Sequence, residues 1–542
     1  PQADIWTAGS PCQNVSIAGG RAGLHGDRSG LFFQFVDLLK GKAEADKPQW
    51  IILENVKGLL SSNAGWDFLE YLGELAEAGY DCEWQIFNSK DYGVPQNRER
   101  VYTIGRLRSR GGREILPISA ESCGNLKQVI GGMQGYRVYD PSGVSSTLAS
   151  EAGGMGAKTG LYLIDQQTGE RTMLPDYDFE PGAGVGTDSA FGGGRTHKYS
   201  VGKVYMLSVD RVTSRLISID GKGDRQVYTK KDGGIQCFDI FGKSVLFIGM
   251  RDGRLPELYS LDLATGEEKR LTSFNEEWYQ QHKPQTPEHF LFRNRDGLEL
   301  DGFVLYPAGF EPGKKYPAVL QIHGGPKGVY GTTYFHEMQV LASHGMFVIF
   351  TNPRGGDGRG SAFADLTRKL GTIDYEDLLD FTDAALARIP EIDGARVGIC
   401  GGSYGGFMVN WMIGHTDRYA AACSQRSIAN YMSKCLTTDI GFTHNLAQMG
   451  TNPWDGFDVM WGTSPLRYAH NAKTPTLFIH SDNDYRCWMS EGLQMFTALK
   501  MQGVKTRLAL YHGESHGLSR TGSPRNRLAR LDEIVSWFEQ NL

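Results

Sequence analysis

The stretch Val397-Gly398-Ile399-Cys400-Gly401-Gly402-Ser403-Tyr404-Gly405-Gly406 decides the fold of the C-terminal half of this chain. A short apolar run leads directly into a Gly-x-Ser-x-Gly turn, and a helical stretch follows from Phe407. Strand, tight turn and helix in this order are the setting of a nucleophile elbow, in which a strained turn exposes a serine hydroxyl. Glycines are required there because side chains would collide with neighbouring backbone. The pattern predicts an α/β sheet that presents Ser403 as a nucleophile.

The segments around this turn have the same character. Apolar runs at 318–322, 347–350 and 476–479 are each followed by a turn and a helical segment. Strands that alternate with helices indicate a sheet with parallel strands. We therefore expect one α/β domain over residues 286–542.

A serine hydroxyl becomes a good nucleophile only when a neighbouring base takes its proton. In this type of fold the acid and the base follow the serine in the order Asp, then His. Asp484 comes just after the strand at 476–479, and His516 comes after an apolar run at 508–510. Asp484 would orient the imidazole of His516 and stabilise its charged form. His512 is an alternative base and Asp482 an alternative acid, because loop register cannot be read from the sequence.

The negative charge that develops on a substrate oxygen needs two backbone donors. The amide of Tyr404, directly after the nucleophile, is predicted to be the first. The second is expected from His323-Gly324-Gly325-Pro326, which follows the strand at 318–322. Gly325 is the predicted donor, and His323 is expected to be structural.

These residues resemble the prolyl oligopeptidase family of serine peptidases, and most closely its acylaminoacyl-peptidase-like branch. The resemblance covers residues from about 161 to the C-terminus. The matching stretches are His323–Pro326, Asn352–Gly355, Gly401–Phe407, Ser464–Leu466, His480–Arg486 and Glu514–Gly517.

The resemblance implies an α/β-hydrolase domain capped by a β-propeller, and hydrolysis of short or N-blocked peptides through an acyl-enzyme, without a cofactor. In that family the acid lies four residues after a histidine, which favours Asp484, although Ser481 stands where glycine is usual. An arginine two positions past the acid grips a substrate carbonyl in many members, and Arg486 matches it. The alternative for Arg486 is a surface ion pair.

A weak internal repeat precedes this domain. Leu161–Asp165 and Leu258–Asp262 are each followed by Thr-Gly-Glu, and 216–221 is a looser third copy. Strand, aspartate and turn at this spacing are typical of propeller blades. Residues 161–285 are predicted to form a partial β-propeller of two to three blades.

The first part of the chain carries a different set of motifs. Pro11-Cys12-Gln13 ends a strand-like run, and Glu54-Asn55-Val56 ends another, so both are expected at one edge of a parallel sheet. Arg98 and Arg100 alternate along a strand predicted over 99–104.

Together these motifs resemble the cytosine-5 DNA methyltransferases, over roughly residues 1–160. Further matches are Asp27–Phe33, Asp91–Pro95 and Arg137–Thr147. The resemblance implies S-adenosylmethionine as cofactor and DNA as partner, with the target base flipped out of the helix. It assigns Cys12 as the nucleophile that attacks the cytosine ring, Glu54 as the acid and Arg98 and Arg100 as supporting residues. It also places Leu31 in the cofactor pocket.

That family begins with a strand and a glycine-rich turn that bind the cofactor, and no such segment precedes Pro1. The fold expected for residues 1–160 is therefore an incomplete Rossmann-like sheet. We expect this part neither to bind S-adenosylmethionine tightly nor to methylate DNA. The two resemblances meet at Thr159–Asp165, which indicates a fusion of two partial segments.

The bulk composition is that of an ordinary globular protein with several domains. The 542 residues are 40% hydrophobic and 22% charged, and the net charge of −6 argues against general nucleic-acid binding. The eight cysteines are scattered without a Cys-x-x-Cys pair, which is typical of free thiols and gives no metal site. No apolar run reaches membrane-spanning length. We expect a cytoplasmic protein without a membrane partner, and self-association is left open.

Overall fold

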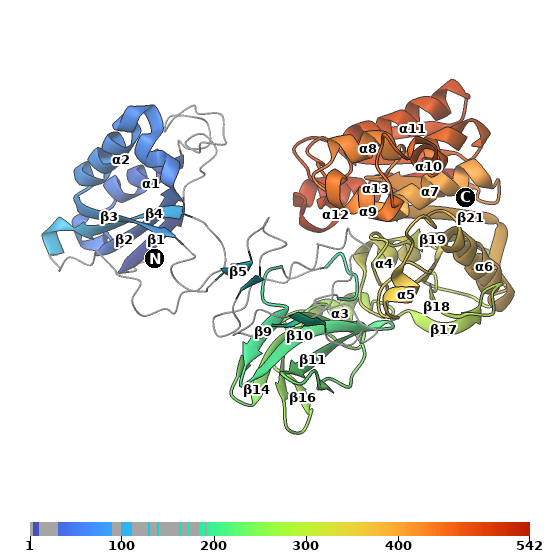
Figure 1. Ribbon diagram of the computed structural model, residues 1–542, viewed down its shortest axis with the longest axis horizontal. Helices are drawn as coiled ribbons and strands as arrows, with labels where there is room; N and C mark the ends of the chain where they lie inside the picture. Colours follow the sequence, from blue (N-terminus) through green and yellow to red (C-terminus); the bar gives the residue numbers. More distant parts are fainter. Residues whose placement is uncertain are drawn as a thin grey trace. The chain divides into compact units, whose positions relative to one another are not determined.

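The structure is a computed structural model that describes residues 4–9, 31–88, 99–110, 128–130, 138–139, 162–164, 171–173, 184–189 and 192–542. The chain divides into two compact units (Figure 1). The first contains Pro1–Thr147 and Ile164–Glu170, and the second contains Leu148–Leu163 and Arg171–Leu542. Each unit is described by itself.

The first unit contains a four-stranded sheet of order β1-β2-β4-β3. The expected parallel pairing is confirmed for β1 and β2, but the sheet as a whole is mixed, because β4 runs antiparallel to both of its neighbours. The alternation of strands and helices in the sequence therefore did not predict the direction of β4. The elements are β1 (Ile5–Gly9), α1 (Leu31–Lys40), β2 (Trp50–Val56), α2 (Trp66–Glu77), β3 (Tyr80–Asn88) and β4 (Glu99–Leu107), followed by the short strands β5 (Gln128–Ile130) and β6 (Val138–Tyr139).

The two amphipathic helices of this unit bury one face each against the sheet. Phe32 and Leu39 of α1 and Phe68 and Leu75 of α2 share a core with Ile51 of β2. Apolar residues recur at helical spacing along 66–78 of the sequence, which is typical of an amphipathic helix with one buried face. Leu69 belongs to this apolar set, but its side chain is 59% exposed.

The second unit begins with short strands and two four-stranded antiparallel sheets. The sheet orders are β12-β11-β10-β9 and β13-β14-β15-β16, and two of the three repeat copies lie in β11 and β15. Strand after strand joined by tight turns is the pattern of propeller blades. The strands are β7 (Tyr162–Ile164), β8 (Arg171–Met173), β9 (His197–Ser200), β10 (Lys203–Asp210), β11 (Thr213–Asp220), β12 (Arg225–Val227), β13 (Gly234–Phe241), β14 (Ser244–Met250), β15 (Glu257–Asp262) and β16 (Glu268–Arg270).

An eight-stranded sheet follows, of order β17-β18-β20-β19-β21-β22-β23-β24. The strands from β20 to β24 along this order are parallel, and β17 and β18 form an antiparallel edge. The predicted α/β architecture is confirmed. The strands are β17 (Glu288–Arg293), β18 (Glu299–Leu305), β19 (Tyr316–Ile322), β20 (Phe347–Thr351), β21 (Ile392–Gly402), β22 (Ala421–Gln425), β23 (Thr476–Ser481) and β24 (Thr506–Tyr511).

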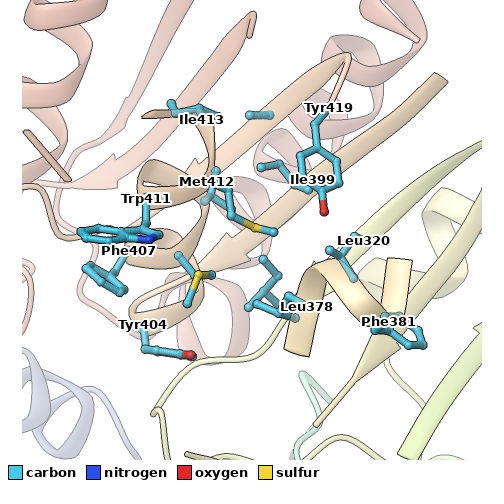
Figure 2. Packing of buried hydrophobic residues seen from close by; sticks show 14 of the residues in the cluster. Leu320, Leu378, Phe381, Ile399, Tyr404, Phe407, Trp411, Met412, Ile413 and Tyr419 are labelled. Atoms are coloured by element: carbon cyan, nitrogen blue, oxygen red, sulfur yellow. The ribbon is translucent and has the colours of Figure 1, made fainter. Parts of the chain in front are cut away.

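Helices cover both faces of this sheet. Successive residues of a strand point to opposite faces, and both sets are apolar here, so each face needs a covering layer. Leu320 of β19 joins one buried cluster, shown in part in Figure 2, with residues of α6, α7 and α11. Val319 joins the other, with residues of α4 and α13. The helices of the unit are α3 (Glu276–His282), α4 (His336–Ser343), α5 (Ser361–Ala364), α6 (Ile373–Arg388), α7 (Tyr404–His415), α8 (Tyr431–Thr437), α9 (Leu446–Met449), α10 (Phe457–Gly462), α11 (Met489–Met501), α12 (Leu518–Thr521) and α13 (Pro524–Asn541).

This arrangement brings the predicted site residues to one edge of the sheet. Ser403 follows β21, Asp484 follows β23 and His516 follows β24, all at the carboxyl ends of parallel strands. Open α/β sheets build their sites at that edge.

Candidate active site

The turn that carries Ser403 has the strained backbone that the motif predicts. Ser403 has φ 63° and ψ −120°, an unusual conformation for a residue with a side chain, and α7 begins at the next residue. The surrounding glycines leave room for this turn. A Cβ atom on Gly405 would lie 2.2 Å from the carbonyl oxygen of Ile322, and one on Gly406 would lie 2.6 Å from that of Gln425. The close packing holds the serine in place against the ends of two neighbouring strands.

The structure brings Ser403, His516 and Asp484 together. The Nε2 atom of His516 lies 3.1 Å from the Ser403 hydroxyl oxygen. Its Nδ1 atom lies 2.8 Å from Oδ2 and 3.0 Å from Oδ1 of Asp484. All three distances are those of hydrogen bonds. With Nδ1 donating to the carboxylate, Nε2 is free to accept the serine proton.

Asp484 is held as an anion although it is buried. Burial acts to raise the pKa of its carboxyl, but the hydrogen bonds that it accepts, first of all from His516, outweigh this effect and the pKa is lowered. The backbone amides of Arg486 and Cys487 also donate to Oδ1, at 3.0 and 2.8 Å. The loop after β23 therefore fixes both the position and the charge of the acid.

Asp482 and His512, the alternative acid and base, form a pair with each other and not with Ser403. The Nδ1 atom of His512 lies 2.5 Å from Oδ2 of Asp482, and the His512 side chain is 97% exposed. The structure therefore contains two Asp–His pairs on neighbouring loops, and only the pair of Asp484 and His516 reaches Ser403.

The imidazole of His516 is held in its neutral form over a wide pH range. Burial lowers its pKa to about 4, against the raising effect of Asp484, and the positive charges of Arg426 and Arg520 lower it further. A general base must be unprotonated to accept a proton, so the base form persists to acidic pH.

We expect kcat/KM to stay constant as the pH is lowered and to fall only near pH 4. His516 stops acting as a base when it is protonated, and its pKa is about 4. The measurement is the pH–rate profile of the chain with a non-ionising acyl substrate, with circular dichroism at each pH to exclude unfolding. An acid limb near the ordinary histidine value of 6.5 in a folded sample would contradict this expectation.

The predicted oxyanion donors lie on the two segments that meet at Ser403. Tyr404 is the first residue of α7. Gly324 approaches the nucleophile closely, since a Cβ atom there would lie 3.5 Å from Cβ of Ser403. Gly325, the predicted second donor, is the next residue of that loop and has φ 137°. Its role as a donor stays a prediction.

Tyr404 has an anchor that the sequence did not reveal. Its phenol donates a hydrogen bond to Oδ2 of Asp374, at 2.8 Å, and both residues are buried. Burial raises the pKa of Asp374 to about 6 and that of Tyr404 well above its usual value. Asp374 lies in the first turn of α6 and anchors Tyr404, whose backbone amide is the predicted first oxyanion donor. No motif marks it, because the contact depends on how α6 packs beside α7.

His323 lies beside the site without contacting the triad. Its ring is 4% exposed and Nδ1 contacts the carbonyl oxygen of Gly324 at 3.0 Å. Burial lowers its pKa to about 4. These contacts agree with the expected structural role of shaping the glycine loop.

Arg486 forms an ion pair in this structure. Its Nε and Nη2 atoms lie 2.9 and 3.1 Å from the two carboxylate oxygens of Asp439. This is the alternative weighed from the sequence. The predicted contact with a substrate carbonyl stays a prediction.

In the first unit, Glu54 lies at the end of β2 and pairs with Arg100 of β4, with 2.8 Å between Nε and Oε1. A Cβ atom on Gly9, the last residue of β1, would lie 3.4 Å from the Glu54 carboxylate. Two of the predicted residues therefore meet beside the end of β1. Leu31, at the start of α1, is 46% exposed. Cys12 and Arg98 lie outside the described residues.

Within the described ranges, no group of three or more His, Cys, Asp or Glu side chains is placed to hold a metal ion. No helix in the same ranges has both the length and the apolar character needed to cross a membrane.

Family models match the two parts of the chain separately. Residues 332–542 match the prolyl oligopeptidase family, and residues 1–142 match the C-5 cytosine-specific DNA methylases. Both resemblances seen in the sequence are confirmed.

Curated relatives and solved structures resemble the later part. An uncharacterized peptidase, YuxL, of Bacillus subtilis is 38% identical over 71% of this chain and 59% of its own length. Dipeptidyl-peptidase 5 of Porphyromonas gingivalis is 27% identical over 77% of this chain and 61% of its own length. An acylaminoacyl peptidase solved with Z-Gly-Gly-Phe-chloromethyl ketone is similar with a TM-score of 0.64 and 33% identity, over 71% of this chain and 59% of that protein. The acylaminoacyl peptidase of Pyrococcus horikoshii is similar with a TM-score of 0.63 and 33% identity, over the same shares of the two chains. The chain thus spans 59–61% of the length of these relatives.

Proposed function

We propose that the second unit, in which residues 332–542 match the prolyl oligopeptidase family, is a serine peptidase that hydrolyses short or N-blocked peptides. One observation carries this proposal. A serine on a strained turn, a histidine and a buried aspartate form a continuous chain of hydrogen bonds. That arrangement is suited to acyl transfer.

In the proposed reaction, Ser403 attacks the carbonyl carbon of the scissile bond while Nε2 of His516 takes its proton. The tetrahedral intermediate places negative charge on the carbonyl oxygen, where the amides of Tyr404 and Gly325 would donate hydrogen bonds. His516 then gives the proton to the leaving amine, which leaves an acyl-enzyme on Ser403. Water, activated by the same imidazole, releases the acid product. No step requires a cofactor.

The chemistry of the relatives supports the substrate class. Two of the similar structures are named acylaminoacyl peptidases, and one of them was solved with Z-Gly-Gly-Phe-chloromethyl ketone. We expect p-nitroaniline release from N-acetylated di- and tripeptide p-nitroanilides to exceed release from the same peptides with a free N-terminus. A reversed preference with active enzyme would point to dipeptidyl-peptidase chemistry instead, and no release from either series would count against the proposed function.

A second candidate function is favoured by one observation, the match of residues 1–142 to the C-5 cytosine-specific DNA methylases. The match suggests S-adenosylmethionine as the cofactor of this part. Of the residues that the resemblance assigns, the described ones are an exposed Leu31 and the ion pair of Glu54 with Arg100. This described subset provides no cradle for the adenosine of the cofactor, so we derive no methyl-transfer step.

A transfer assay decides between the two candidates. The chain is incubated with duplex DNA and S-adenosylmethionine that carries a labelled methyl group, beside a Cys12→Ala variant. We expect no label in the DNA. If the unmodified chain transfers label to the DNA and the Cys12→Ala variant does not, the second function would be established.

A further inference from the structure

A buried lysine near the proposed active site has no counter-ion within the described part of the chain. Lys434, on α8, is 3% exposed. Its Nζ atom donates to the side-chain oxygen of Asn445, at 2.9 Å, and lies 5.7 Å from the ring centre of Tyr431. Both partners are uncharged. No carboxylate lies within ion-pair distance of Lys434 among the residues that the structure describes.

The nearby acidic groups are engaged elsewhere. Glu491 accepts hydrogen bonds from the backbone amides of Ala429 and Asn430, at 2.9 and 2.8 Å, and from the hydroxyl of Ser433. Asp439 pairs with Arg486. The Cys487 thiol does not supply a charge, because burial raises its pKa to about 12. Burying an ammonium group without a partner is costly, so such a group is a candidate functional site.

Asn445 adds further donors to the same place. It is fully buried, and its amide nitrogen has no hydrogen-bond partner within the described part of the chain. An ammonium has three N–H donors and an amide has two. Among the residues that the structure describes, one of these donors meets an acceptor, the side-chain oxygen of Asn445 itself. The pair therefore presents several buried N–H groups that lack an acceptor, together with a positive charge.

This pair lies next to the nucleophile. The thiol of Cys487 interacts electrostatically with Lys434, and the backbone amide of Cys487 donates to Oδ1 of Asp484, at 2.8 Å. The ring of Tyr431 contacts that of Phe407, one turn after the serine on α7, with 5.6 Å between centres. Burial lowers the pKa of Lys434. A bound anion would offset that effect, since an opposite charge favours the charged form.

From these contacts we propose that Lys434 and Asn445 receive an acidic side chain, on the substrate residue whose carbonyl Ser403 attacks. The proposal rests on the proposed peptidase function and names the substrate class of its site. Because the attacked carbonyl would lie against Ser403, the side chain of that substrate residue is the part that would extend toward Lys434. A glutamate or aspartate carboxylate would supply the missing counter-ion and accept the free N–H groups.

The test compares substrates that differ only in charge. Acetyl-Ala-Ala-Glu-p-nitroanilide and its glutamine and leucine analogues are hydrolysed by the full chain at pH 7. We expect kcat/KM to be at least about tenfold higher for glutamate than for glutamine, because a hydrogen bond between charged groups is stronger than a neutral one. Equal or lower values for glutamate would overturn the proposal, and this comparison needs no variant.

A variant assigns the preference to Lys434. Lys434→Met keeps the side-chain length and removes the charge, so we expect kcat/KM for the glutamate substrate to fall about 10- to 100-fold, while that for leucine changes less than about threefold. Lys473→Met is the matched control, because that side chain is 76% exposed and pairs with Asp417 on the surface. A glutamate preference that survives in folded Lys434→Met would overturn the assignment.

Labelling by a fluorophosphonate separates this proposal from the proposed function, because the probe needs no particular side chain. If Ser403 is labelled and the glutamate preference is absent, only the acidic specificity fails. If Ser403 is not labelled, the peptidase function itself fails. If Ser403 is labelled but no anilide is cleaved, competition decides: N-acetylglutamate α-amide should slow labelling more than N-acetylglutamine α-amide, and equal slowing would overturn the proposal.

Discussion

Replacing Ser403 by alanine is expected to abolish hydrolysis of acylated peptides, with kcat lowered by about 10⁵- to 10⁶-fold. The hydroxyl oxygen is the atom that forms the acyl-enzyme, and no other hydroxyl is hydrogen-bonded to His516 among the described residues. The remaining rate would come from binding and the oxyanion donors alone. The measurement is p-nitroaniline release at saturating substrate.

The effect should be confined to chemistry. Alanine fits the space left by the hydroxyl, so KM and the thermal unfolding midpoint are expected to change little. Ser515→Ala, one residue before the base, is the control for a serine in the same loop region and should keep most of the activity. A Ser403→Ala variant that retains more than a hundredth of the rate would show that another group is the nucleophile.

Replacing Asp484 by asparagine is expected to lower kcat about 10⁴-fold while the site keeps its shape. An amide in place of the carboxylate can no longer accept the Nδ1 proton in every orientation, so His516 can adopt the tautomer that carries its proton on Nε2. The developing imidazolium would also lose its buried negative neighbour. The measurement is single-turnover acylation, which isolates the step that uses the base.

The chain supplies its own matched control for this experiment. Asp482 and His512 form a similar pair two and four residues away, on the same loops, but on the surface. Asp482→Asn and His512→Ala should leave kcat within about threefold of the unmodified chain, since exposed pairs contribute little. Comparable losses at Asp482 and Asp484 would mean that the loops, and not the hydrogen-bond chain, carry the effect.

The sequence predicted the large sheet and the triad well, for a physical reason. Each side chain of the proposed triad is tied to the end of a strand whose apolar run is visible in the sequence, and the strained turn at Ser403 requires glycines at fixed positions. The structure also separates the pair of Asp482 and His512 from the pair of Asp484 and His516, which the sequence left open. That choice depends on loop register and on burial, and neither has a local sequence signal.

The residues that the sequence did not reveal act across long separations. Asp374 meets Tyr404 only because α6 packs beside α7, and Lys434 meets Asn445 only because the chain turns back after α8. In the first unit the antiparallel direction of β4 was also missed, because a helical pattern before β3 resembles the start of a parallel unit. Packing of this kind is decided by tertiary contacts, not by spacing.

The most direct test of the central claim is the site of covalent labelling. The full chain is treated with a fluorophosphonate, digested and analysed by mass spectrometry, beside His516→Ala. We predict a single adduct on Ser403, formed at least about 100-fold more slowly when His516 is replaced, because the imidazole lies 3.1 Å from the hydroxyl and accepts its proton. An adduct on a different residue, or none on folded protein, would contradict the account.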